Sequence, residues 1–271
     1  MNIVSASPTQ PWLITLEAYQ NLAATLSTAV PVPTGKEEAP AAPYAAKNGV
    51  AVIPIHGTMM RQVRPQLKAR AEVWGIRLCD MQQTAAAIRL AAADNSIHTV
   101  ILDIDSPGGT VNGTPELAYA VESLSQSKHV YAYTSGQCCS AAYWVASQTD
   151  GIYATPSAIV GSIGVILPIL DSSAHYEREG IKVEVFSAGK YKSTGVDGTS
   201  LTDDQRARLT QQVHATWETF KQAVTRRRNI DAADMEGQTF YGSEARDHAL
   251  VDALAYNLDS LQVKLAQRHQ F

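Results

Sequence analysis

The feature that most constrains the fold is a series of short apolar segments that alternate with helix-forming segments. "GVAVIPIHG" (49–57), "HTVILDID" (98–105) and "HVYAYTSG" (129–136) are largely apolar and rich in β-branched or aromatic residues. Such runs are typical of strands that are buried on both faces of a sheet. Between them, "CDMQQTAAAIRLAAAD" (79–94) and "PELAYAVESLSQ" (115–126) contain mostly strong helix formers. Strands that alternate with helices predict an α/β domain with a parallel sheet and crossover helices.

The C-terminal half extends this pattern. Further strands are predicted at "GIYAT" (151–155), "SIGVIL" (162–167) and "KVEVFS" (182–187). A long helix then begins at Thr202, which forms a capping box with Gln205. The apolar face of this helix consists of Leu209, Val213, Trp217, Phe220 and Val224.

The N-terminal region differs in composition from the rest. Residues 11–27 have apolar side chains at helical spacing and predict a short amphipathic helix, and a Pro- and Ala-rich stretch after them reads as a linker. We therefore expect an N-terminal helix and linker over 1–47 and a globular domain with C-terminal helices over 48–271. Within that domain, residues 58–77 break the strand–helix pattern and predict an excursion, such as a flap over a site.

Composition excludes several classes of protein. The net charge of −4 and the lack of a basic stripe argue against a nucleic-acid partner. Three cysteines, two of them adjacent, have neither the number nor the spacing of a disulfide framework or a zinc site. No apolar run reaches the length of a membrane span. We expect a cytoplasmic protein without a metal or other cofactor.

The sequence "DSPGG" (105–109) follows an apolar strand directly. Consecutive glycines allow a sharp turn and leave a backbone N–H unshielded by a Cβ atom, and such an N–H can stabilise an oxyanion. The alternative is an ordinary turn between a strand and a helix.

Ser140, in "SGQCCSAAYWVAS", follows a strand and begins a helix. A serine there is either an N-cap or a nucleophile in the positive potential of the helix N-terminus. Both turns follow successive parallel strands at their carboxyl ends, where open α/β sheets place their sites. The N–H of Gly108 or Gly109, together with that of Ala141, would then receive one carbonyl oxygen.

A nucleophilic serine needs a base. None of the seven histidines lies in a recognisable motif, and only His56 and His175 are kept as candidates. A lysine that burial keeps neutral is the other possibility. "FSAGKYKSTG" (186–195) contains Lys190 and Lys192, although lysines in a loop are usually exposed to solvent.

Four motifs in order, "LDIDSPGG", "CCSAAYWVAS", "GSIGV" and "SAGKYKSTG", resemble the signal peptide peptidase A family of Ser-Lys dyad peptidases. Within it the chain is most similar to the phage prohead proteases. The resemblance implies a Clp protease/crotonase-like fold with Ser140 as nucleophile and Lys192 as general base, with Lys190 as the fallback. It also implies that Ser162 orients the lysine, and that Gly108 (Gly109 as second choice) and Ala141 form the oxyanion hole.

The function implied is an endopeptidase that processes capsid, scaffold or portal proteins as a homo-oligomer, in the host cytoplasm or the procapsid. The related Clp subunit places a histidine in the segment that reads "GSIGVI" here, which has none, and this favours the lysine. The alternatives are a host peptidase that degrades signal peptides, a crotonase-like acyl-CoA enzyme, and an inactive structural component of capsid assembly.

Overall fold

The protein is built around a six-stranded sheet. The computed structural model describes residues 11–27 and 43–268, with the backbone alone for 24–27. All neighbouring strands are parallel except β2, which pairs antiparallel at one edge. In spatial order the strands are β13 (Ala253–Leu254), β10 (Gly151–Ala154), β8 (His129–Thr134), β6 (Thr99–Asp105), β3 (Val50–His56) and β2 (Ala45–Lys47).

Two smaller sheets continue from the carboxyl ends of these strands. The first runs β1 (Trp12–Ile14), β7 (Gly108–Thr110), β4 (Thr58–Met60), β5 (Leu78–Asp80), and the second runs β12 (Thr239–Tyr241), β11 (Ile159–Gly161), β9 (Gln137–Cys139). A bridge between Ser106 and Cys138 joins the turn after β6 to β9. The predicted mixed α/β fold with a parallel sheet is therefore confirmed.

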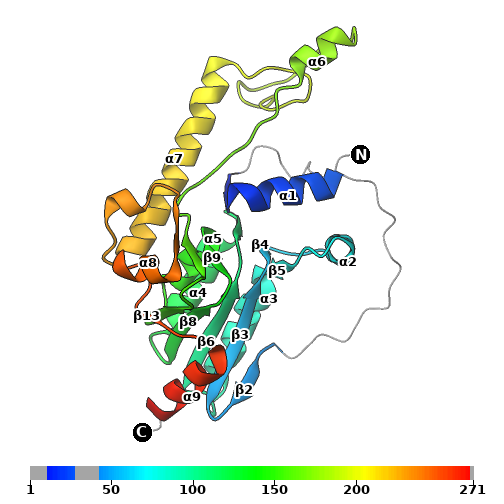
Figure 1. The fold of residues 1–271 in the computed structure, drawn as a ribbon. Helices are drawn as coiled ribbons and strands as arrows, with labels where there is room; N and C mark the ends of the chain where they lie inside the picture. Colours follow the sequence, from blue (N-terminus) through cyan, green and yellow to red (C-terminus); the bar gives the residue numbers. More distant parts are fainter. Residues whose placement is uncertain (1–10, 28–42, 269–271) are drawn as a thin grey trace.

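The helices cover the sheet and extend from it (Figure 1). They are α1 (Leu16–Ser27), α2 (Pro65–Val73), α3 (Met81–Ala93), α4 (Thr114–Leu124), α5 (Ala141–Ala146), α6 (Ser173–Arg178), α7 (Asp203–Thr225), α8 (Gly242–Asp247) and α9 (Leu258–Arg268), with a 3-10 turn at Ala232–Asp234. No helix in the described part of the chain has the length and apolar character needed to cross a membrane.

The alternation of side chains along the strands explains why both faces of the sheet are buried. On β6, Val100, Leu102 and Ile104 belong to the main core with α3, α4 and α5. Ile101 points to the opposite face, where it packs with Leu261 of α9. A strand between two helical layers is apolar over most of its length, and this is why the largely apolar run at 98–105 could be identified from sequence.

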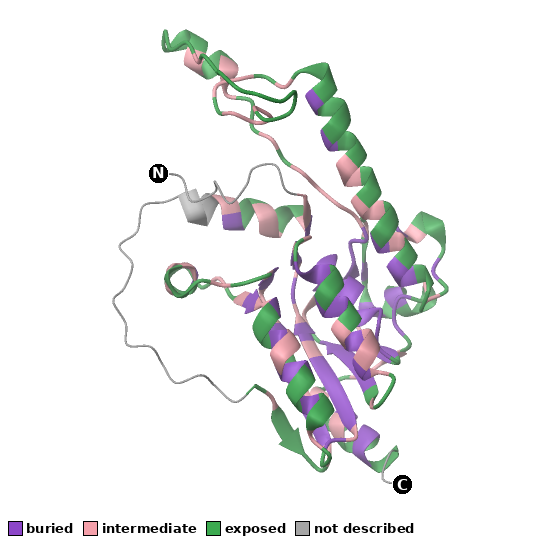
Figure 2. Cartoon of the chain, turned by 180° about the vertical axis from the view of Figure 1, so that it is seen from behind, coloured by how far each residue is buried: buried purple, intermediate pink, exposed green. Residues whose placement is uncertain are grey.

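A long arm leaves this core. We define the arm as residues 167–202, which contain α6 and the turns that lead into α7. The arm projects from the rest of the molecule in both views (Figures 1 and 2). None of its residues is buried, whereas all six residues of α5 are (Figure 2).

Three predictions of local structure are wrong. Residues 182–187 form no strand, because in this chain no neighbouring strand pairs with them. The strand expected at 162–167 lies at Ile159–Gly161 and ends where Gly161 and Ser162 adopt positive φ angles of 117° and 53°. The segment 11–27 begins as β1 before α1, since Trp12–Ile14 pair with β7. The predicted linker lies largely outside the described residues, and the boundary at 47/48 stays a prediction.

Candidate active site

Ser140 connects β9 to α5 in a strained conformation. Its φ and ψ angles are 54° and −116°, outside the regions that residues with a Cβ normally adopt. Its N–H donates a 2.8 Å hydrogen bond to the Gly161 carbonyl oxygen of the neighbouring strand β11. A non-glycine residue held this way costs about 1–3 kcal/mol, and such residues cluster at functional sites.

The Ser140 hydroxyl does not cap α5. The residue occupies the N-cap position, but its side chain accepts no hydrogen bond from the first turn of the helix. Its Oγ instead donates to the Gly164 carbonyl oxygen over a long 3.4 Å, and the residue is completely buried. The capping interpretation therefore fails, because an N-cap serine acts through its side chain.

The glycine turn lies beside the start of α5. Gly108 has a φ of 104°, which favours glycine, and its N–H donates to Ser106 Oγ at 3.2 Å. A Cβ atom on Gly109 would overlap the Met59 carbonyl oxygen, so only glycine fits there. The strand β7 that contains both glycines packs against α5. Ala141, as the first residue of α5, has an N–H with no carbonyl one turn earlier in the helix.

Ser162 lies next to Ser140. The last pair of the parallel strands β9 and β11 is Cys139 with Gly161, so the two serines leave adjacent strands together. Ser162 also has a positive φ, of 53°, and its N–H donates to the Gln238 carbonyl oxygen at 2.7 Å. Within the described residues its hydroxyl has no hydrogen-bond partner, which leaves it free to orient another group.

The candidate lysines lie outside this cluster, on the arm. Lys192 is exposed in a turn, where its N–H donates to the Gly189 carbonyl oxygen at 3.1 Å. Lys190 is also exposed and forms a 2.7 Å ion pair with Asp204 at the start of α7. The hydrogen bond to Asp204 raises the pKa of Lys190, which is the opposite of what a general base requires. The structure thus brings together Ser140, Ser162, Gly108, Gly109 and Ala141, but not either lysine.

The two candidate histidines do not take the place of the lysine. His56 Nε2 lies 2.9 Å from Asp103 Oδ2, and His175 lies on α6 in the arm. Neither forms a hydrogen bond with Ser140. Across residues 11–27 and 43–268, no basic side chain hydrogen-bonds the Ser140 hydroxyl within one chain.

Comparison with known proteins now identifies the family. The model of peptidase family S49 matches residues 122–270, more than half of the chain. The chain belongs to peptidase family S49. This confirms the resemblance to the signal peptide peptidase A family and its phage members.

Two phage proteins illustrate the membership in family S49. The chain is 29% identical to capsid assembly protease C of Escherichia phage lambda, over 85% of this chain and 52% of that protein. It is 30% identical to head-tail preconnector protein GP5 of Enterobacteria phage P21, over 83% of this chain and 44% of that protein. The chain therefore spans about half the length of these relatives. Among solved structures, the membrane-bound stomatin-specific protease 1510-N matches at 17% identity with a TM-score of 0.45, over 80% of this chain and 84% of that one.

The three buried thiols are not alternative nucleophiles. Burial raises the pKa of Cys139 to about 12, and that of Cys79 to about 11. Cys138 is completely buried, and its pKa is also raised by burial. Since the thiolate is the reactive form, these cysteines pack as small apolar groups.

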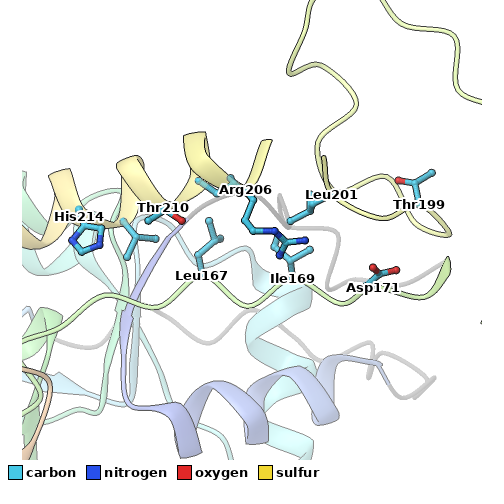
Figure 3. Close-up of a pocket in the computed structure, with 10 residues that line it drawn as sticks. Leu167, Ile169, Asp171, Thr199, Leu201, Arg206, Thr210 and His214 are labelled. Carbon is cyan, nitrogen blue, oxygen red and sulfur yellow. The ribbon is translucent and has the colours of Figure 1, made fainter. Parts of the chain in front are cut away.

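A cavity lies away from this cluster. It holds about 440 Å³ between residues 167–171 and the first turns of α7. Leu167, Ile169 and Leu201 face α7 there, with Arg206, Thr210 and His214 opposite (Figure 3). No residue of the predicted site lines it, so it belongs to the base of the arm and not to the candidate site around Ser140.

Sequence reasoning missed two parts of the site. One is the Gly164 carbonyl that holds the Ser140 hydroxyl, and the other is β1, whose segment reads as the start of a helix. The only signal for β1 was the apolar triplet Trp12–Ile14 before Thr15. Its partner strand lies almost one hundred residues away, so no local pattern could reveal the pairing.

Proposed function

We propose that this chain is a serine endopeptidase in which Ser140 attacks the scissile carbonyl and forms an acyl-enzyme. One observation carries the proposal. Ser140 is held in a strained conformation at a helix N-terminus, next to a glycine turn, and its hydroxyl does not cap the helix. Such strain is kept only where the surroundings fix it, and here it directs the hydroxyl away from the helix it begins.

The oxyanion would be stabilised by two backbone N–H groups, those of Gly108 and Ala141. Both lie where the positive end of α5 adds to their effect. The Gly108 N–H donates a long hydrogen bond of 3.2 Å to Ser106 Oγ. A developing oxyanion would be a stronger acceptor than this hydroxyl and would take over the N–H. The carbonyl carbon then bonds to Ser140 Oγ, and the amine of the next residue departs after it is protonated.

Lys192 is the proposed base, and the arm suggests that it acts on another copy of the chain. In one chain Lys192 is exposed, while Ser140 is buried without a basic partner. An arm that docks over the Ser140 region of a neighbouring copy would bury the Lys192 amine, and burial lowers the pKa of a lysine. Neutral Lys192 would then take the Ser140 proton and pass it to the leaving amine, with the Ser162 hydroxyl holding the amine in place.

The surface of the arm supports a homo-oligomer. Large apolar side chains are exposed there, including Phe186, whose residue is 93% exposed. Several large apolar side chains exposed along one segment favour an interaction site there. The others on the arm are Leu170, Ile181, Val185 and Tyr191.

The proposed substrates are capsid, scaffold or portal proteins, processed in the host cytoplasm or in the procapsid. The support comes from the similar phage proteins, one named a capsid assembly protease and the other a head-tail preconnector protein. No coenzyme or metal takes part in the proposed steps.

The test is labelling of Ser140 by a fluorophosphonate, alongside cleavage of a peptide library. The native chain should be labelled and cleave peptides, and Ser140→Ala should lose the label and about 10⁴-fold or more of the rate. Ser147→Ala is the matched control, since Ser147 is equally buried at the C-cap of α5, and its hydroxyl hydrogen-bonds to Trp144 and Gln148 and not to the candidate site. Equal cleavage by Ser140→Ala and the native chain would refute the proposal.

A further inference from the structure

The strand β1 fills a slot one strand wide. On one side it pairs antiparallel with β7, with Ile14 opposite Gly108 and Trp12 opposite Thr110. On the other side the Trp12 N–H donates to the Ile166 carbonyl oxygen at 2.8 Å, and the Ile166 N–H donates back to Trp12 at 3.0 Å. The segment is thus held on both of its edges, by β7 on one and by the Trp12–Ile166 pair on the other.

Both walls of this slot belong to the candidate active site. Gly108 lies in the glycine turn, and the other wall follows Ser162 and Gly164, whose carbonyl oxygen accepts the Ser140 hydroxyl. Ile166, which forms the antiparallel bridge with Trp12, lies only two residues after Gly164 along the chain. A Cβ atom on Gly108 would contact both the Leu13 and the Cys139 carbonyl oxygens, so the Leu13 carbonyl lies close to the residue that precedes Ser140.

While β1 is in place, this arrangement is closed to another peptide, so substrates would enter only in the fraction of chains from which β1 has left the slot. Ser140 and Leu13 are completely buried, and Ile14 nearly so. An endopeptidase must bind its substrate in an extended form across the nucleophile, and exposed strand edges bind such peptides by adding a strand. Without β1, the edges of β7 and of residues 164–166 would offer their backbone N–H and C=O groups to a peptide in the same place.

We propose that β1 is a resident occupant of the peptide-binding slot, so that the N-terminal segment of this chain inhibits its own active site until it is displaced. The slot therefore accepts an extended peptide with an apolar residue at the position of Leu13. The inference rests on the proposed role of Ser140. Measuring peptide binding in chains that cannot catalyse tests the occupied slot separately from the proposed role of Ser140.

The experiment uses full-length chains that carry Ser140→Ala and either Leu13→Asp or Leu16→Asp. A carboxylate at the buried position 13 should expel β1 from the slot, whereas Leu16 is 58% exposed and serves as the matched control. The probe is a fluorescein-labelled peptide of residues 10–18, and binding is followed by anisotropy. We expect the Leu13→Asp chain to bind the probe at least about tenfold more tightly than the control.

Equal binding by two chains that are equally folded, judged by thermal unfolding, would overturn the inference. If Leu13→Asp does not fold, a protease recognition sequence placed between residues 28 and 42 allows the native segment 1–27 to be cut loose after folding. Excess unlabelled peptide should then displace that segment, and a segment that cannot be displaced contradicts the proposal.

With Ser140 restored, Leu13→Asp should also raise kcat/KM about tenfold over Leu16→Asp. If neither chain cleaves peptides while the difference in binding remains, the proposed peptidase function fails and the occupied slot stands. If both chains cleave peptides and the probe binds equally to both, the proposed peptidase function stands and the occupied slot is refuted.

Discussion

Every side chain of α5, the helix that follows Ser140, is buried, whereas no residue of the arm between 167 and 202 is. The α5 region is held from several directions. Trp144 stacks on Phe220 of α7 with ring centroids 4.9 Å apart, and the Tyr143 hydroxyl donates to the Leu250 carbonyl oxygen at 2.9 Å. The arm instead is held by polar contacts of its own, such as the hydrogen bonds from Ser172 and Tyr176 to Asp197.

The difference shows which part of the proposed active site a single chain can form and which part it leaves incomplete. The core fixes the proposed nucleophile and the proposed oxyanion hole by packing, which needs no partner. The hydrogen bonds from Ser172 and Tyr176 to Asp197 hold the local shape of the arm, and they also lower the pKa of Asp197. The arm nevertheless exposes its apolar side chains. A site divided in this way would become complete only on assembly.

The two lysines of the arm give the largest expected effect. Lys192→Ala should lower kcat by about 10²–10⁴-fold, the usual contribution of a general base. Lys190→Ala should stay close to the native rate, because Lys190 is engaged with Asp204. Rates are measured on a peptide that the native chain cleaves. A full loss in Lys190→Ala with none in Lys192→Ala would move the base to the fallback position.

Mixing inactive chains shows whether the base comes from a neighbour. Ser140→Ala and Lys192→Ala are each expected to be inactive alone. Mixed and reassembled, they should regain activity, because some assemblies would join an intact serine to an intact lysine. No recovery in mixed oligomers would place both groups in one subunit.

One phenylalanine in the core, Phe220, and one on the arm, Phe186, allow the two regions to be compared by their contribution to stability. Phe220→Ala should lower the free energy of unfolding by about 3–5 kcal/mol, since it removes a completely buried ring stacked on Trp144. Phe186→Ala should change it by less than about 0.5 kcal/mol but weaken assembly. Denaturant unfolding and size-exclusion chromatography measure the two effects. A destabilisation of several kcal/mol in Phe186→Ala would show that the arm packs within its own chain.

The buried thiols give the smallest effect, at alkaline pH. Their pKa in the folded chain, about 11 for Cys79 and about 12 for Cys139, exceeds the ordinary value of 9.0. Above pH 9 the unfolded chain has therefore lost protons that the folded chain still binds, so stability falls as pH rises. Each thiol contributes at most about 1.4 kcal/mol per pH unit to this slope. Unfolding between pH 9 and 10 should be less pH-dependent in Cys79→Ala, and an unchanged slope would contradict the burial of Cys79.

Local sequence patterns correctly predicted the strands and helices that pack in the regular layers of the α/β core. The strands at 98–105 and 129–136, the helices at 79–94 and 115–126 and the capping box of Thr202 and Gln205 all form as predicted. The pattern failed at 182–187, because alternating apolar residues fit a strand only when another strand is present to pair with them. It failed at 162–167 because positive φ angles at Gly161 and Ser162 end the strand.

The sequence by itself determined the parallel sheet, the glycine turn, the serine at the start of α5 and the resemblance to the signal peptide peptidase A family, because each is written in residues close together along the chain. Only the tertiary structure decided that the Ser140 side chain does not cap its helix, that Lys192 lies on an exposed arm, and that β1 closes the slot beside Gly108. Those features depend on pairings between distant segments and on backbone angles that packing imposes, and local composition specifies neither.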